Sequence, residues 1–221
     1  MDTFEIIVRY REGFLSGLFV TLRLGAITWA FGLTVGTMLG ASAYIWPRWA
    51  GWPLRGFSVL LAGIPFLVLL YWANYPLQEL FGIIIDPFAT AAGLLCLINI
   101  VLVAEIWRGA LNDFPKEYVI AGKVTGLNTA DILQYIQLPI LFRQVLPSVI
   151  ASQVAMLQLT LFASLISVEE LFRVSQRINA SIQKPIEIYT ALAIFFFALS
   201  APLYGLAYVL RSRFTRDLSE T

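Results

Sequence analysis

Five long stretches without a charged residue constrain the fold of this chain more than any other feature. They cover residues 24–47, 56–78, 87–104, 144–168 and 188–210. A helix needs about 17 to 25 residues to cross ~30 Å of hydrocarbon. A spanning segment must be helical, because an open strand would leave its backbone groups unpaired in lipid. We therefore predict an all-α polytopic membrane protein, with five transmembrane helices in a single domain over residues 1–221.

Composition excludes several classes of protein. Of the 221 residues, 59% are hydrophobic and 13% are charged, which is far from the usage of a water-soluble domain. The sequence contains no histidine, so we expect neither imidazole metal sites nor histidine-activated nucleophiles. The single cysteine, Cys96, lies in an apolar run and is interpreted as a packing residue. A net charge of +1 without a basic cluster argues against nucleic-acid binding.

The lysine and arginine residues predict how the chain is oriented. An odd number of spans places the two termini on opposite sides of the membrane. With the C-terminus inside, nine of the 15 Lys and Arg residues fall on the cytoplasmic side, as the positive-inside rule requires. We therefore expect the N-terminus outside and the C-terminus in the cytoplasm. Trp46, Trp49 and Trp52 would form an interfacial belt at the first cytoplasmic turn.

Small residues mark one face of the first predicted span. Gly32, Gly36 and Gly40 recur every four residues, which lets another helix approach closely. The sequence leaves two interpretations open, namely packing within this chain or contact with a second subunit.

The longest polar-rich segment, residues 105–143, lies inside the chain and carries a spaced motif. Charged and apolar positions alternate in it, so we expect short helices on the cytoplasmic side that offer a docking surface. The motif begins with Ile120-Ala121-Gly122, followed after three residues by Gly126 and after nine more by Ile136-x-Leu138-Pro139. This resembles the cytoplasmic EAA loop of ABC importer permeases, with five of its seven fixed positions matched. The acidic residue that opens that loop is Ile120 here, and its second Ala is Gly122.

Other segments narrow the resemblance to the polar amino-acid permeases. Gly17-Leu-Phe-Val-Thr-Leu22, Ala104-Glu-Ile-Trp-Arg-Gly109 and Ser167-Val-Glu-Glu-Leu171 are similar to family segments in the same order. The resemblance implies a type I importer permease of the bacterial inner membrane that carries an amino acid or a related polar solute. It also implies an ATPase dimer, a second permease subunit and an extracytoplasmic solute-binding protein as partners.

The resemblance assigns ATPase coupling to one set of residues in the loop. These are Ile120, Ala121, Gly122, Gly126 and Leu127. ATP and magnesium are expected on the partner ATPase and no cofactor on this chain, because the sequence lacks a Gly-x4-Gly-Lys-Ser/Thr phosphate loop. The Lys-Asp-Thr-Ser-Leu of the family's fourth span is Gln158–Phe162 here, so both charges are missing. We therefore expect the less polar half of a heterodimer.

A few polar residues remain inside the predicted spans. Gln153, Thr160 and Ser164 follow helical spacing on the fourth span, and Gln158 and Asn99 lie in the fourth and third spans. They either line a translocation path or form bonds within the protein, since hydroxyl groups also bond to their own helix.

Glu105 and Arg108 lie three residues apart at the end of the third span, and we interpret them as a structural ion pair.

Two other classes of protein compete with the importer. An ATPase-independent carrier or channel would need its own ion site, but the predicted spans contain no carboxylate. An intramembrane enzyme would need a Ser/Lys or Asp/Asp pair within the spans, and neither is visible. The importer permease is therefore the favoured interpretation.

Overall fold

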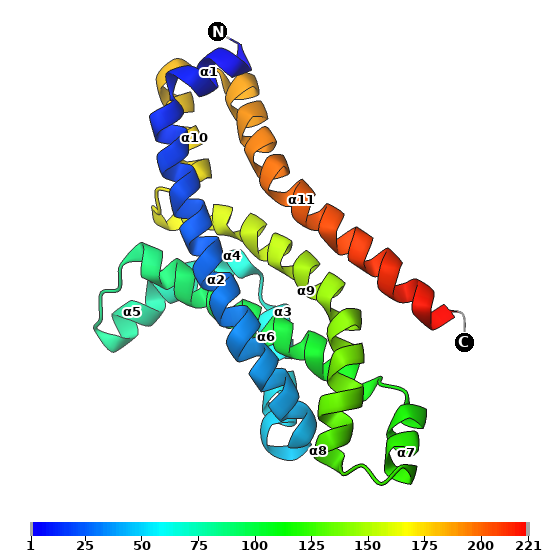
Figure 1. The fold of residues 1–221 in the computed structure, drawn as a ribbon. Helices are drawn as coiled ribbons and strands as arrows, with labels where there is room; N and C mark the ends of the chain where they lie inside the picture. Colours follow the sequence, from blue (N-terminus) through cyan, green and yellow to red (C-terminus); the bar gives the residue numbers. More distant parts are fainter. Residues whose placement is uncertain (1, 220–221) are drawn as a thin grey trace.

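The computed structural model describes the backbone of residues 2–219, and the side-chain environment of these residues except Thr129 and 214–219. Every regular element within this range is helical, which confirms the predicted all-α polytopic fold (Figure 1). Four helical runs are long and apolar enough to cross a membrane, and a bent helix pair supplies a fifth span if it is counted as one. The four runs are α2 (Arg11–Ile45), α6 (Pro87–Asn112), Ile132–Ile166, and α11 (Pro185–Ser219) over its residues 185–213.

The second predicted span, residues 56–78, is not one continuous helix. Helix α3 (Trp52–Gly63) ends before Pro65, and α4 (Phe66–Asn74) begins after it, with α5 (Pro76–Phe81) following. The chain bends by 96° between the two halves of this pair. Pro65 has no N–H to donate and pushes Ile64 into an extended conformation, with φ −112° and ψ 125°. The prediction of a single helix here was wrong because it ignored this proline.

The helices also extend beyond the other predicted spans. Helix α2 begins 13 residues before position 24, and α6 continues eight residues past position 104. The fourth helical run comprises a π-helical turn (Ile132–Gln137), α9 (Leu138–Leu159) and a 3-10 segment (Thr160–Ile166). The predicted loop 105–143 is therefore mostly helix, and only residues 113–131 lie between the long runs. This stretch contains α7 (Lys116–Val124) and the short α8 (Thr129–Asp131).

The glycine stripe of α2 packs against α6 of the same chain. A Cβ atom added at Gly32 would lie 2.0 Å from Asn99 Nδ2. At Gly36 it would lie 2.8 Å from the Ile100 carbonyl oxygen, and at Gly40 2.6 Å from that of Ala104. Each glycine thus lets the α6 backbone or a polar side chain come into contact with α2. In this structure the stripe is a packing surface within the chain.

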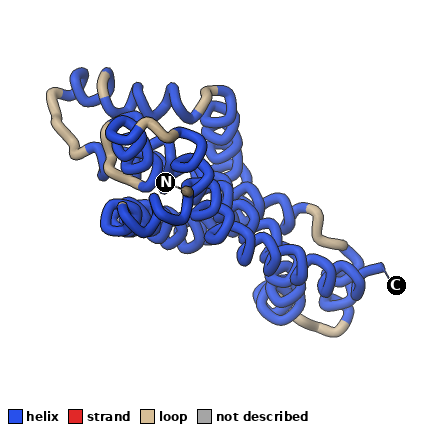
Figure 2. Tube along the Cα trace, turned by 90° about the horizontal axis from the view of Figure 1, so that it is seen from above, coloured by secondary structure: helices blue, strands red, loops and turns tan. Residues whose placement is uncertain are grey.

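The elements gather at two opposite ends of an elongated molecule. Helix α1 (Thr3–Arg9), α10 (Leu171–Ile182) and the start of α11 lie together at the end that carries the N-terminus (Figure 1). Helices α7 and α8 lie at the other end, together with the π-helical turn Pro47–Gly51. Seen from the N-terminal end, the helices form an extended array with the two termini well apart (Figure 2). The two ends thus offer separate surfaces to partners.

Candidate functional site

Helix α7 is held against its own chain by Gly122. This residue is buried, and a Cβ atom added to it would lie 2.9 Å from Ile132 Cγ1 and 3.0 Å from Ile136 Cδ1. The family's alanine at this position would collide with the two isoleucines. The family resemblance predicts Gly122 as an ATPase-coupling residue. The structure places it on the inner face of α7, where it fixes how the helix sits on the start of the fourth helical run.

Gly126 ends α7 in a left-handed turn. Its φ of +83° is a conformation that other residues rarely adopt. Gly126 N–H donates to the Lys123 carbonyl and Leu127 N–H donates to the Gly122 carbonyl, both at 3.1 Å. These two bonds form a Schellman motif, which satisfies carbonyls at the end of the helix. The turn therefore fixes where the chain leaves α7 toward α8.

The exposed side of α7 carries apolar side chains next to the charged Lys116, Glu117 and Lys123. Ile120 is 59% exposed and Val124 is 81% exposed, and their spacing of four places them on the same face. Ala121 and Leu127 are also exposed. We call the set Ile120, Ala121, Val124 and Leu127 the α7 face. Val124 was missing from our predicted residues, although its spacing from Ile120 could have revealed it.

Asn99 and Gln153 form a hydrogen-bonded pair in the interior. Asn99 Nδ2 donates to Gln153 Oε1 at 2.8 Å, and Gln153 Nε2 donates back to Asn99 Oδ1 at 3.2 Å. Asn99 Nδ2 also donates to the Thr28 carbonyl at 2.8 Å, while Trp29 Nε1 donates to the Gln153 carbonyl at 2.9 Å. The two amides thereby join α2, α6 and α9. Both side chains are buried within the subunit, so their bonding explains their presence without a solute.

The remaining polar residues of the fourth helical run do not share one surface. Thr160 is buried and donates to the Leu157 carbonyl at 2.6 Å, and Ser164 is also buried. Both lie in the 3-10 segment, where the spacing of an α-helical stripe no longer holds. Gln158 is exposed and faces away from this interior. Of the five residues predicted for a translocation path, Gln158 is thus the one that the isolated subunit presents at its surface.

Glu105 and Arg108 contact each other on α6. Arg108 Nε donates to Glu105 Oε2 at 3.0 Å, and a second guanidinium nitrogen binds the same oxygen. Both side chains are largely buried. The pair lies within one helix at a spacing of three residues, which agrees with the predicted structural ion pair.

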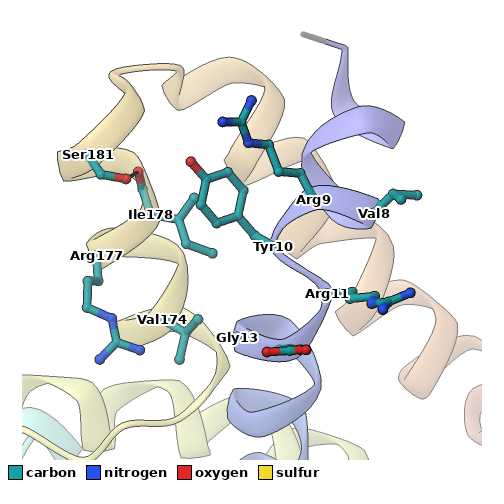
Figure 3. Close-up of a pocket in the computed structure, with 10 residues that line it drawn as sticks. Val8, Arg9, Tyr10, Arg11, Gly13, Val174, Arg177, Ile178 and Ser181 are labelled. Atoms are coloured by element: carbon teal, nitrogen blue, oxygen red, sulfur yellow. Dashed lines mark hydrogen bonds between the residues drawn. The ribbon is translucent and has the colours of Figure 1, made fainter.

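An open hollow of about 710 Å³ lies between α10 and the junction of α1 and α2. Its lining includes Arg9, Arg11 and Arg177 (Figure 3). The three guanidinium groups point in different directions in this view, and Arg177 Nη1 is bonded to Glu169 Oε2 at 2.7 Å. The hollow is therefore a charged surface feature, and its cationic groups do not converge on one ligand.

Glu170 carries a buried carboxyl group at the end of the molecule that contains α1 and α10. Its side chain caps α10 by accepting hydrogen bonds from Phe172 N at 2.9 Å and Arg173 N at 2.8 Å. Burial raises the pKa of Glu170 to about 7. The two backbone hydrogen bonds act in the opposite direction, because they favour the charged carboxylate. Ser167–Leu171 resembles the family in sequence, but that resemblance does not predict the capping role of Glu170.

The raised pKa predicts that stability depends on pH. The folded chain binds the proton of Glu170 more tightly than the unfolded chain does. Proton binding at Glu170 therefore stabilises the folded state fully below about pH 4.5, and this stabilisation is lost as the pH rises through about 7. In the Glu170→Gln variant, the midpoint of thermal unfolding in detergent should change less between pH 5 and pH 8 than in the wild type. The control is Glu79→Gln, which removes an exposed carboxylate on α5 that does not shift the pKa of Glu170, and it should keep the slope of the wild type. Equal slopes in all three proteins would contradict this role of Glu170.

Comparison with known proteins identifies the family of this chain and several of its relatives. The sequence pattern of the family described as "Binding-protein-dependent transport system inner membrane component" matches residues 32–216. The chain belongs to this family. The permease is 27% identical to the glutamine transport system permease protein GlnP of Escherichia coli (strain K12) over 194 residues, which cover 86% of this chain and 87% of that protein. It is 28% identical to the octopine transport system permease protein OccM of Rhizobium meliloti over 189 residues, or 79% of this chain and 75% of that protein.

A further relative and a solved structure extend this agreement. The permease is 24% identical to the histidine/lysine/arginine/ornithine transport system permease protein HisQ of Salmonella typhimurium over 212 residues, which cover 91% of this chain and 92% of HisQ. Its fold matches "Crystal structure of an amino acid ABC transporter with histidines" with a TM-score of 0.85 and 23% identity, covering 96% of this chain and 99% of that one. The fold is therefore that of a type I ABC importer permease.

Proposed function

We propose that this permease forms one half of the membrane channel of an importer for an amino acid or a related small polar solute. The energy comes from a partner ATPase dimer, which binds ATP and magnesium, and the solute arrives on an extracytoplasmic binding protein. The names of the relatives support this solute class, since they transport glutamine, octopine, or histidine and other basic amino acids.

The observation that carries the proposal is the exposed α7 face. A helix at the end of the molecule shows Ile120 and Val124 to the outside, while Gly122 fixes its inner face. Apolar side chains on a short helix outside the long helical runs suit a groove on another protein. We assign this groove to the ATPase, so that its closure moves α7 and, through Ile132 and Ile136, the fourth helical run.

The second permease subunit is proposed to be a different chain. Gln158 is the one residue among our predicted path residues that is exposed, and it stands where the family has a charged residue. A partner subunit would then supply most of the polar contacts along the path. An active importer that contains two copies of this chain and no second permease would contradict the heterodimer.

Docking of the ATPase is tested by charging the α7 face. In the variant Ile120→Asp with Val124→Asp, two carboxylates enter the apolar contact, and we expect at least a tenfold loss of ATPase retained on the purified permease complex. The matched control is Ile84→Asp, because Ile84 is 100% exposed and lies outside the α7 region. It should retain the ATPase as the wild type does. Full retention in the double variant would place the docking surface elsewhere.

A further inference from the structure

Three exposed tryptophans surround the turn between α2 and α3, and neither the α7 face nor the path uses them. Trp46 is 57% exposed, Trp49 86% and Trp52 69%. An indole ring combines a large apolar body with one N–H group, a pairing that favours the boundary between hydrocarbon and water. We call residues 46–55 the tryptophan turn. It lies at the same end of the molecule as α7 (Figure 1).

The tryptophan turn is packed firmly on the chain behind it. Gly51 is buried, and a Cβ atom added to it would lie 2.9 Å from the Ala43 carbonyl oxygen. Leu54 is also buried, in a cluster with Ala43, Val101 and Ala104. The π-helical turn closes through Gly51 N–H, which donates to the Trp46 carbonyl at 3.3 Å. The three indoles are therefore presented outward by a rigid support.

Exposed apolar side chains lead to this turn along both helices. Met38 and Ile45 of α2 are 71% and 50% exposed, and Val59 and Leu60 of α3 are 72% and 52% exposed. Such surfaces suit the hydrocarbon of a bilayer. The turn lies between the C-terminal end of α2 and the N-terminal end of α3. We therefore expect the tryptophans to lie at the depth of the lipid headgroups.

The charged residues of the turn itself, and of the sequence on both sides of it, are all positive. From residue 13 to residue 78 the sequence contains Arg23, Arg48 and Arg55 but no Asp or Glu. Arg48 and Arg55 are exposed, and among the residues that the structure describes neither forms an ion pair with a carboxylate. Guanidinium groups bind phosphate through paired hydrogen bonds.

These observations identify the chemistry of a partner. We propose that the tryptophan turn is a binding site for anionic phospholipids, in which Arg48 and Arg55 bind the headgroup phosphate while the indoles contact the upper part of the acyl chains. A zwitterionic lipid offers the same phosphate together with a cation of its own, so the two arginines favour the anionic lipid. A protein partner at this place would have to supply carboxylates to both arginines instead.

The test measures contact between lipid and indole directly. The permease assembled with its ATPase is placed in two kinds of phosphatidylcholine vesicle. One kind contains phosphatidylglycerol with brominated acyl chains, and the other contains the same mole fraction of phosphatidylcholine with brominated acyl chains. Bromine quenches the fluorescence of indoles that it touches. The variant Trp46→Phe with Trp49→Phe and Trp52→Phe supplies the background from the other three tryptophans. The difference between wild type and this variant is the signal of the turn.

Phosphatidylglycerol is expected to quench the turn at a much lower mole fraction than phosphatidylcholine. Each arginine near a membrane surface changes lipid affinity about fivefold, so Arg48→Gln with Arg55→Gln should reduce the preference by about 25-fold. The control Arg23→Gln alters the third arginine of the same stretch, which lies over the Phe88 ring, and should keep the preference. Equal quenching by both lipids in the wild type would overturn the proposal. Absence of quenching by either lipid would also overturn it, because the turn would then be covered by protein.

Discussion

Gly126→Val is expected to reduce solute-stimulated ATP hydrolysis at least tenfold while the permease remains in the membrane. Gly126 has a φ of +83°, and a β-branched residue in this conformation costs on the order of 1–3 kcal/mol. Nothing lies within 4 Å of the added Cβ atom, so the effect comes from the backbone alone. The strain is relieved by opening the turn, which breaks the bond from Leu127 N–H to the Gly122 carbonyl. Helix α7 then no longer moves with its support, and hydrolysis loses its link to transport.

Gly82→Val is the matched control for this experiment. Gly82 also has a positive φ, +63°, and also has nothing within 4 Å of an added Cβ atom. It follows α5, outside the α7 region, so the same kind of strain should leave stimulated hydrolysis close to that of the wild type. Hydrolysis of ATP is followed in proteoliposomes with and without loaded binding protein. Unchanged uptake and unchanged stimulation in Gly126→Val would refute the coupling role of this turn.

Gly32→Val should destabilise the permease more than any other single change considered for its core. The added Cβ atom would lie 2.0 Å from Asn99 Nδ2 and 2.4 Å from Asn99 Cγ. Overpacking costs about 1–3 kcal/mol, and losing the buried bonds of Asn99 adds a similar amount. The sum, roughly 2–6 kcal/mol, is a large part of the stability of a typical domain. Chemical unfolding in detergent should therefore begin at a clearly lower denaturant concentration, and the yield of folded protein should fall.

Two comparisons isolate this clash from the general effect of a β-branched residue. Gly93 lies in the N-terminal part of α6 with nothing within 4 Å of an added Cβ atom, so Gly93→Val should change stability by less than about 1 kcal/mol. Adding Asn99→Ala to Gly32→Ala should restore part of the stability lost in Gly32→Ala, because the amide that blocks the new methyl group is removed. Wild-type stability in Gly32→Val would show that α2 and α6 do not pack through Asn99.

The sequence predicted the four long spanning helices and the position of the α7 region for clear physical reasons. Long apolar stretches are required in lipid, and the spacing around Gly126 places a turn after a short helix. The bend at Pro65 was also written in the sequence, since a proline removes a backbone donor. We missed it because an unbroken run of uncharged residues was taken as a single helix.

The roles of individual polar and small residues could not be predicted in the same way. Asn99 and Gln153 are 54 positions apart, and only the crossing of α6 and α9 shows that each satisfies the other. Gly122 matched a docking motif by its place in the sequence, whereas its neighbours Ile132 and Ile136 decide that it faces inward. Likewise, periodicity along the fourth span assumed an α-helix, and the 3-10 segment from Thr160 changes which side chains share a face.

Solute uptake into proteoliposomes tests the central claim most directly. Vesicles contain this permease with or without its ATPase and second permease subunit, and labelled glutamine, histidine or octopine is offered together with the binding protein and internal ATP. Our account predicts uptake of one such solute only when the ATPase is present and ATP is hydrolysed. Uptake by the permease in vesicles that lack the ATPase would contradict it and would identify a self-contained carrier or channel.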